Sequence, residues 1–355
     1  ANGEFIQVHP TAIPGTDKCR LMSESARGEG GRVWTYKDGK PWYFLEEMYP
    51  AYGNLVPRDI ATRAIFKVCT EMRLGVDGKN QVYLDLTHMD PHELDVKLGG
   101  ILEIYEKFVG EDPRKYPMKI FPAVHYSMGG LWVDFDQQTS IPGVFAAGEC
   151  EYQYHGANRL GANSLLSCIF GGSVAGPKAV ACVQGQAKSE IASRLFDEEV
   201  ARQEEVFRSI YASDGGENPY RIWREMGDLM NENVTIVRYN DKLRATDEKL
   251  LELQDRYRKI TIEDKSRWSN QSALFARQLG MMLDLARVIA IGALRRDESR
   301  GAHYKPDFPD RDDARFLKTT IAKWTKTGPE FSYEEVDTQH IKPRERKYDV
   351  AKTAA

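Results

Sequence analysis

The sequence lacks the long hydrophobic runs and the cysteine spacing that define several classes of protein. Its apolar stretches, such as residues 288–294, fall far short of the ~20 residues that a membrane-spanning helix needs. The five cysteines are scattered and form no CxxC pair, which argues against a disulfide framework and against a zinc site. We therefore expect no transmembrane segment, and the cysteine usage fits a reducing cytoplasm.

An excess of basic charge is also missing. Lys and Arg number 49 against 53 Asp and Glu, which gives a net charge of -4. No overall positive field exists to hold nucleic acid or an acidic membrane surface, so we expect no nucleic-acid partner. Any membrane association would come through another protein. The N-terminus has neither the basic start nor the apolar run of a signal peptide.

The composition is that of a folded chain with more than one domain. Of the 355 residues, 41% are hydrophobic and 29% are charged, a balance that supports a sizeable core. Residues 1–123 mix short β-like runs with glycine-rich turns. Their patterns predict helices near 59–74 and 91–109 and a short strand at 119–124. This first segment is interpreted as an α+β module.

A different pattern covers residues 124–180. A short apolar strand is predicted at 144–147, and a helix is predicted from about Ser164. Glu149 follows the strand at the position where open α/β sheets bind nucleotides, although an exposed strand-end carboxylate explains it equally well. Ser164 begins the helix with a capping side chain, and free backbone amides at such a start stabilise negative charge.

The second half of the chain is predicted to be largely helical. Long polar segments with apolar residues at helical spacing predict a bundle from about 186 to 298. The stretch from His303 is rich in Pro, Asp and other charged residues, and it is interpreted as a solvated tail over the surface. The whole pattern predicts a multidomain chain with α+β and α/β parts. The apolar stripe of the last long helix is expected at Leu274, Met281, Leu285, Val288 and Ile291.

Five short segments concentrate Gly, His, Arg and Glu beyond what packing requires. Arg offers a planar fork that matches a carboxylate, while His and Ser donate single hydrogen bonds. No pair of carboxylates is spaced for hydrolysis, so the set predicts a clamp for an anion, with a small dicarboxylate as the natural ligand. The segments are His9-Pro10-Thr11, the run from Ser23 to Gly31, Arg58-Asp59, the run from His125 to Gly130, and the run from His155 to Ser164.

Each of these groups also has a plainer interpretation. A single histidine such as His9 or His155 is more often structural, and Arg58-Asp59 could be an ordinary helix start. A metal is the rival ligand for the histidines, but no two of His9, His125 and His155 lie at the spacing expected on one helix face. We therefore expect no metal, and the case for an anion site depends on the joint occurrence of the motifs.

Taken in order, these motifs resemble the flavoprotein subunit of succinate dehydrogenase and fumarate reductase, most closely the Gram-positive bacterial type. The run from Glu298 to His303 continues the resemblance towards the C-terminus. It implies four domains, which are a capping domain at 1–123, the second half of a Rossmann-like FAD-binding domain at 124–180, a helical domain at 181–300 and a C-terminal extension at 301–355.

The resemblance also implies roles for individual residues. The substrate dicarboxylate would be held by His9, Ser23, His125 and Arg159, with Ser23 standing where a Thr is usual. Arg58 would transfer the proton, and Glu24 and Arg27 would relay it. Glu149, Ser164 and Leu165 would contact the flavin.

The implied reaction interconverts succinate and fumarate, with hydride transfer to FAD and proton transfer by an arginine. The implied partners are an iron-sulfur subunit and a cytochrome b membrane anchor, which would hold the protein peripherally at the cytoplasmic face of the cell membrane. The G-x-G-x-x-G fingerprint of the family and its flavin-attaching histidine are not found in the sequence. We therefore expect the C-terminal part of a subunit, inactive in isolation and holding FAD weakly or not at all.

Two other interpretations stay open. L-aspartate oxidase shares the His-Pro-Thr, Arg-Gly-Glu-Gly and Asn-Arg-Leu patterns, but it generally lacks a tail such as the one at 316–348. The chain could also be a non-catalytic fragment that folds without a cofactor, although its intact set of candidate ligands argues against this for the parent protein.

Overall fold

A computed structural model describes residues 1–15, 20–161, 163–184 and 192–344. The chain divides into two compact units. The first, here called the sheet unit, contains the described residues of 6–126, those of 158–163 and the C-terminal segment from Asp337. The second, here called the helical unit, contains residues 1–5, 127–157 and the described part of 164–336. Each unit has its own hydrophobic core.

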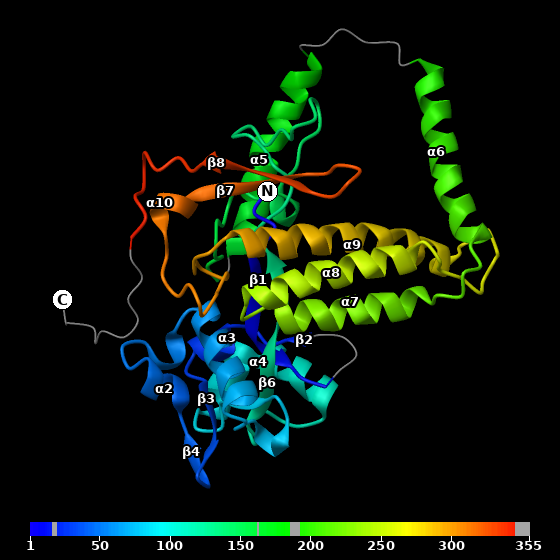
Figure 1. The fold of residues 1–355 in the computed structure, drawn as a ribbon. Coiled ribbons are helices and arrows are strands. Elements are labelled where there is room, and N and C mark those ends of the chain that lie inside the picture. The colour runs from blue at the N-terminus through cyan, green and yellow to red at the C-terminus, as the bar shows by residue number, and fades with distance from the viewer. Residues whose placement is uncertain (16–19, 162, 185–191, 345–355) are drawn as a thin grey trace. The chain divides into compact units, whose positions relative to one another are not determined.

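The sheet unit is built on a six-stranded sheet with the strand order β2-β1-β6-β5-β3-β4 (Figure 1). Strand β3 pairs antiparallel with both β4 and β5, and β5 pairs antiparallel with β6. The central strand β6 thus brings a distant part of the chain next to β1. The strands are β1 Ile6–Ile13, β2 Arg20–Leu21, β3 Arg32–Lys37, β4 Lys40–Trp42, β5 Val82–Asp85 and β6 Met118–Ser127.

Four α-helices accompany this sheet. The predicted helix near 91–109 is confirmed as α4, which the side chain of Asp90 caps by accepting from two backbone amides and which ends at Gly110 with φ of 81°. The predicted helix near 59–74 is confirmed as α3 followed by a π-helical turn, η2. The helices are α1 Ser25–Gly28, α2 Phe44–Met48, η1 Gly53–Leu55, α3 Arg58–Phe66, η2 Lys67–Glu71, η3 Val76–Gly78 and α4 Pro91–Val109.

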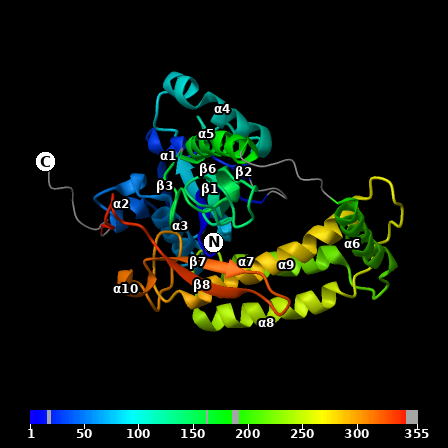
Figure 2. The same cartoon turned by 90° about the horizontal axis from the view of Figure 1, so that it is seen from above.

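The helical unit confirms the predicted bundle. Helices α7, α8 and α9 run side by side, and α6 packs against α9 (Figure 2). A two-stranded antiparallel hairpin, β7–β8, follows near the C-terminus. The elements are η4 Gly148–Cys150, α5 Asn163–Gln184, α6 Ser193–Ala212, α7 Pro219–Asn233, α8 Asn240–Tyr257, α9 Gln271–Arg295, α10 Asp313–Phe316, β7 Lys318–Lys323 and β8 Glu330–Glu335.

The apolar stripe predicted for α9 is wrong at three of its five positions. Leu274, Met281 and Leu285 are exposed, at 40%, 48% and 60% of their surface. The buried face carries mainly small residues, because closely packed helices leave little room between their backbones. Among the larger apolar side chains, Leu279 and Leu283 are buried with these small residues, and Val288 and Ile291 of the predicted stripe are half-buried. The buried residues of α9 are Ala273, Ala276, Leu279, Leu283, Ala286, Ala290, Gly292 and Ala293.

The strand predicted at 144–147 is also wrong. The segment forms only an isolated bridge between Gln138 and Phe145. The amide of Thr139 donates to the carbonyl of Val144 at 2.8 Å, and the amide of Ala146 donates to the carbonyl of Gln137 at 3.0 Å. These bonds close one short turn and do not continue into the longer ladder that a strand requires.

The C-terminal stretch from His303 is not the solvated tail that its composition predicted. His303 is completely buried and Lys305 is 1% exposed. The Lys305 ammonium donates to Asn240 Oδ1, the carbonyl of Leu294 and Asp297 Oδ1, at 2.6, 3.0 and 2.9 Å. Charged residues that the composition assigned to solvent are buried because they pair with one another. Residues 342–344 of the basic run near the end are exposed, and 345–347 lie outside the described residues.

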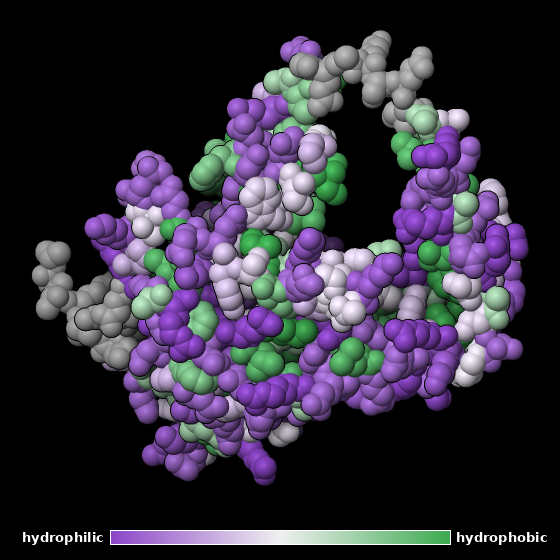
Figure 3. Space-filling model, turned by 45° about the horizontal axis from the view of Figure 1, so that its top comes forward, coloured by the Kyte–Doolittle hydropathy of each residue, from purple (hydrophilic) through white to green (hydrophobic). Residues whose placement is uncertain are grey.

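One helix is longer and more apolar than the stretches on which the expectation of no transmembrane segment was based. Helix α5 has 22 residues and a mean hydropathy of 1.4 over its most apolar window, so it is long and apolar enough by length and composition alone. Only 11% of that window is buried, and apolar side chains reach the surface around this helix (Figure 3). A single helix of this kind is weak evidence for a membrane span.

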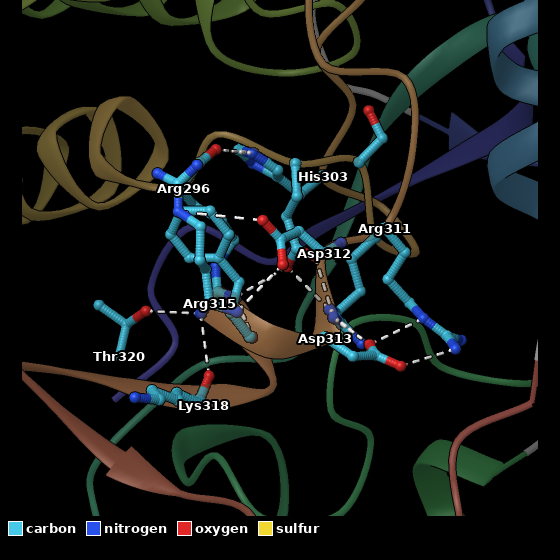
Figure 4. Close-up of polar contacts among 12 residues, drawn as sticks. Arg296, His303, Arg311, Asp312, Asp313, Arg315, Lys318 and Thr320 are labelled. Carbon is cyan, nitrogen blue, oxygen red and sulfur yellow. Dashed lines mark hydrogen bonds and ion pairs between the residues drawn. The ribbon is translucent and has the colours of Figure 1, made fainter.

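A buried ionic cluster joins distant segments of the helical unit (Figure 4). The guanidinium of Arg296 donates to Glu4 Oε1 at 2.8 Å and to Glu298 Oε1 at 2.9 Å, and all three side chains are almost completely buried. It also donates to the carbonyls of Phe316 and Lys318, at 2.8 and 3.0 Å. The cluster thus connects the N-terminal residues, the end of α9 and the start of β7.

Arg296→Met should strongly destabilise the protein. The substitution leaves the buried carboxylate of Glu4 without its cation and removes one of the two cations of Glu298, which keeps its contact with Arg300. The loss of the Glu4 partner alone costs roughly 3–5 kcal/mol in free energy of unfolding. Urea unfolding followed by fluorescence measures it. Arg202→Met is the matched control, because Arg202 pairs with Glu199 at the surface, where an ion pair contributes at most about 1 kcal/mol. Equal losses for the two variants would contradict the interpretation.

Candidate active site

Side chains from separate segments of the sheet unit converge at one place. Strands β1 and β6 are neighbours in the sheet, and the rings of His9 and His125 meet edge to face with centroids 5.1 Å apart. Helix α3 packs against β1, where the hydroxyl of Thr62 donates to the carbonyl of Val8 at 3.2 Å. The first residue of α3 is Arg58, so the packing brings its guanidinium towards the histidines.

The carboxylate of Glu24 is at the centre of the cluster. Oε1 accepts from Nε of Arg27 at 2.7 Å, and Oε2 accepts from Nε of Arg58 at 2.9 Å. The Nε2 atom of His9 lies 3.7 Å from Oε2. One carboxylate therefore connects two guanidiniums in an unbroken row, the arrangement that the predicted proton relay requires.

Both site histidines are held neutral. Burial, reinforced by the positive charge of Arg58, lowers the pKa of His9 from 6.5 to about 2. Burial, followed by the charges of Arg159 and Arg58, lowers the pKa of His125 to about 4. Nδ1 of His9 lies 3.3 Å from the backbone amide of Thr11 and 3.1 Å from its hydroxyl oxygen, which hold the ring in place. A neutral imidazole keeps one N–H group, so His9 remains a hydrogen-bond donor at neutral pH.

Arg159 adds a third guanidinium. It is 3% exposed and lies over the ring of Tyr126, with its Cζ atom 4.7 Å from the ring centroid. Its Nε donates to Oε1 of Gln7 at 3.1 Å. Arg58 Nη1 donates to the same oxygen at 3.4 Å. Gln7 was missed in the sequence interpretation, although a residue two positions before His9 on a strand shares its face.

A cavity of about 220 Å³ lies among these groups, which is room for a small ligand only. Three guanidiniums and one carboxylate border it or its edge, so with neutral histidines the group carries a net charge of +2. Asp59, next to Arg58, pairs with Arg63 at 3.6 Å. Nη1 of Arg27 is buried and has no hydrogen-bond partner among the described residues. The lining residues are Glu24, Arg27, Gly28, Asn54, Leu55, Val56, Pro57, Arg58, Asn158, Arg159, Leu160 and Gly161.

Within the described part of the chain, Ser23 makes no hydrogen bond with the other predicted ligands. Its hydroxyl accepts from the backbone amide of Ser25 at 3.2 Å and so helps the turn that begins α1. Its predicted contact with substrate stays a prediction. Among the described residues, no group of three or more His, Cys, Asp or Glu side chains could hold a metal ion.

The three predicted flavin contacts belong to the helical unit. The exposed Glu149 accepts from the backbone amide of Ser127 at 3.0 Å, just after Gly148, which has a φ of +81°. Ser164 lies in the first turn of α5, and Leu165 is 74% exposed. An accessible carboxylate, an apolar side chain and the amide end of a long helix fit a cofactor that has hydroxyl, apolar and anionic parts.

Comparisons with known proteins first define the class. Residues 1–165 match the family model of an FAD-binding domain, and residues 223–348 match the model of the C-terminal part of fumarate reductase flavoproteins. The chain belongs to the family of flavoprotein subunits of succinate dehydrogenase and fumarate reductase. This agrees with the resemblance that its motifs indicated.

Individual relatives narrow the comparison. The chain is 65% identical to a succinate dehydrogenase flavoprotein subunit of Bacillus subtilis, covering 100% of this chain and 61% of that relative. It is 36% identical to a fumarate reductase flavoprotein subunit of Haemophilus influenzae, over 97% of this chain and 59% of that relative. The solved structure of a quinol fumarate reductase of Escherichia coli matches with a TM-score of 0.89 and 34% identity, covering 98% of this chain and 61% of that chain. The chain thus spans about three fifths of the length of these relatives.

The neutral, buried His9 should make the stability of the protein depend on pH. Its pKa is lower in the folded state than the 6.5 of an exposed histidine, so below about pH 6.5 the unfolded chain binds more protons. Stability should fall as pH falls, by about 1.4 kcal/mol per pH unit for this one group. Unfolding free energies measured from about pH 7 down to about pH 5 should show a shallower slope for His9→Gln.

His92→Gln is the control for this measurement, because it removes an exposed histidine of the same unit. A wild-type slope retained by His9→Gln would show that His9 is not held neutral in the folded protein.

Proposed function

We propose that this chain belongs to a flavoprotein that interconverts succinate and fumarate, and that the sheet unit carries its substrate site. The observation that carries the proposal is the contact of Glu24 with both Arg27 and Arg58 beside a small cavity that Arg159 also lines. A cavity with excess positive charge suits a small dianion. The names of the relatives, succinate dehydrogenase and fumarate reductase flavoprotein subunits, support the same chemistry.

Substrate would be held by hydrogen bonds from Arg159, which lines the cavity, and from two histidines that lie outside its lining. Arg159 would bind one carboxylate through its fork, and the neutral His9 and His125 would each donate a single hydrogen bond. The hydroxyl of Ser23 is proposed as a further donor. Neutral imidazoles donate without adding charge, so the guanidiniums set the charge of the site while the histidines set the orientation of the ligand.

Arg58 is proposed to deliver or accept the proton. Guanidinium is almost always protonated in proteins, so donation during fumarate reduction is its simple direction. For succinate oxidation, Arg58 would first give a proton to the carboxylate of Glu24, and Arg27 would take that proton from Glu24 as it releases one of its own. The unsatisfied, buried Nη1 of Arg27 marks the far end of this row. FAD, when bound, would supply the acceptor for the hydride.

In this proposal the cofactor would contact Glu149, Ser164 and Leu165. We also propose a division of the chain into four domains. They are a capping domain at 1–123, the second half of a Rossmann-like FAD-binding domain at 124–180, a helical domain at 181–300 and an extension at 301–355. An iron-sulfur subunit and a cytochrome b anchor are the proposed partners, which would place the protein at the cytoplasmic face of the membrane. Quinol fumarate reductase among the matching structures supports a complex of this kind.

Arg58→Lys tests the proposed function in a flavoprotein of full family length that contains this chain. Lysine keeps the charge but loses the planar fork that reaches both Glu24 and Gln7. Turnover with succinate, measured by reduction of a dye, should fall by about 100-fold or more. Arg63→Lys, one turn later on α3, is the matched control and should retain activity.

Two results would contradict the proposal. One is an Arg58→Lys variant as active as the control. The other is a parent protein that oxidises L-aspartate and not succinate, which would favour the aspartate oxidase interpretation.

A further inference from the structure

Gln7 is a buried residue that contacts both Arg58 and Arg159 in the candidate site. It is 1% exposed and lies in β1, on the same face as His9. Its amide makes four hydrogen bonds, and none of them serves the pairing of the sheet. Nε2 donates to the carbonyl of Arg159 at 2.7 Å and to Asn158 Oδ1 at 3.3 Å, while Oε1 accepts from Arg159 Nε at 3.1 Å and from Arg58 Nη1 at 3.4 Å.

This network determines which way the amide points. The carbonyl of Arg159 can only accept, so it must face the NH₂ group of Gln7. The guanidiniums of Arg58 and Arg159 can only donate, so both must face the oxygen. A flipped amide would place oxygen against oxygen and NH₂ against two cations. The amide of Gln7 therefore has a single orientation. In it, one uncharged oxygen atom accepts hydrogen bonds from two positively charged guanidiniums.

The contacts leave a defined part of Arg58 for a ligand. Its Nε is committed to Glu24 and its Nη1 to Gln7. Nη2 lies 3.8 Å from the position that a Cβ on Gly161 would occupy, and Gly161 lines the cavity. Gln7 thus helps to turn Nη2 of Arg58 towards the cavity. The same amide oxygen also holds Arg159 in place by accepting from its Nε.

The neutrality of Gln7 matters as much as its position. A carboxylate there would accept the same two hydrogen bonds more strongly. It would also reduce the net charge of the group from +2 to +1. An amide orients the guanidiniums and leaves their charge available to a ligand with two negative charges.

We propose that Gln7 is a positioning residue that aligns Arg58 with Arg159 and keeps the cavity selective for dicarboxylates. The proposal depends on the proposed function, because it assigns Gln7 a part in that same site. It predicts that loss of the Gln7 hydrogen bonds lowers kcat, whereas a negative charge at position 7 weakens the binding of dicarboxylates.

Two variants of Gln7 separate these consequences in a flavoprotein of full family length that contains this chain. Gln7→Met keeps the volume and loses the hydrogen bonds. Its kcat with succinate should fall by about 10- to 100-fold, because a displaced proton-transfer group loses its alignment. Gln7→Glu keeps the shape and adds a charge. Its Kd for malonate, measured by calorimetry, should rise by about 10-fold or more, and its Kd for acetate should rise much less.

Gln81→Met is the matched control. Gln81 is a second buried glutamine of the sheet unit, 7% exposed, and its amide binds the carbonyl of Val76 and the carboxylate of Asp77. It should retain both kcat and malonate affinity. If Gln7→Met fails to fold, Gln7→Glu still decides, because the malonate-to-acetate affinity ratio reports charge rather than stability.

The outcomes distinguish the two proposals. An active parent with a Gln7→Met variant within about twofold of its kcat, or a Gln7→Glu variant with an unchanged malonate-to-acetate ratio, would overturn the role of Gln7 alone. A parent that neither turns over succinate nor binds malonate would overturn the proposed function, and the role of Gln7 with it.

Discussion

The carboxylate of Glu24 accepts hydrogen bonds from Arg27 and Arg58 and lies close to His9. Without a negative charge between them, the two guanidiniums would repel each other in a partly buried place where water screens charge poorly. The carboxylate makes their approach possible, and their approach makes the small cavity electropositive. The geometry of Arg58 and the charge offered to a ligand both depend on this one group, and the guanidiniums that it holds together help burial to keep the histidines neutral.

The helical unit depends on the reverse arrangement. There a single buried cation, Arg296, binds two buried carboxylates and two backbone carbonyls. The two clusters differ in whether any charge or hydrogen-bond donor remains without a partner. Arg296 is surrounded by acceptors from its own unit, which suits a structural junction. The cluster around Glu24 has more cations than anions and a buried donor on Arg27 with no partner among the described residues, which suits a site that awaits an anionic ligand.

Much of this organisation could be predicted from local sequence. Helix α4 was predicted because its apolar residues recur at helical spacing, and the bundle of α6 to α9 followed from the same signal. The stripe on α9 failed because sequence reasoning favours large apolar residues, whereas close helix packing buried alanines. The stretch from His303 failed because charged residues such as Lys305 were assigned to solvent, and only pairing with distant groups made their burial favourable.

The sequence by itself proposed the residues of the candidate site. The motifs around His9, Glu24, Arg58, His125 and Arg159 predicted them together, because guanidiniums and imidazoles that occur jointly in these patterns suit an anionic ligand. Only the tertiary structure decided how those groups are connected. Neighbouring positions of β1 and β6 and the packing of α3 on β1 join residues far apart in the chain. Gln7, a neutral residue inside a strand, has no chemical signal of its own, and its role exists only because two arginines meet at its oxygen.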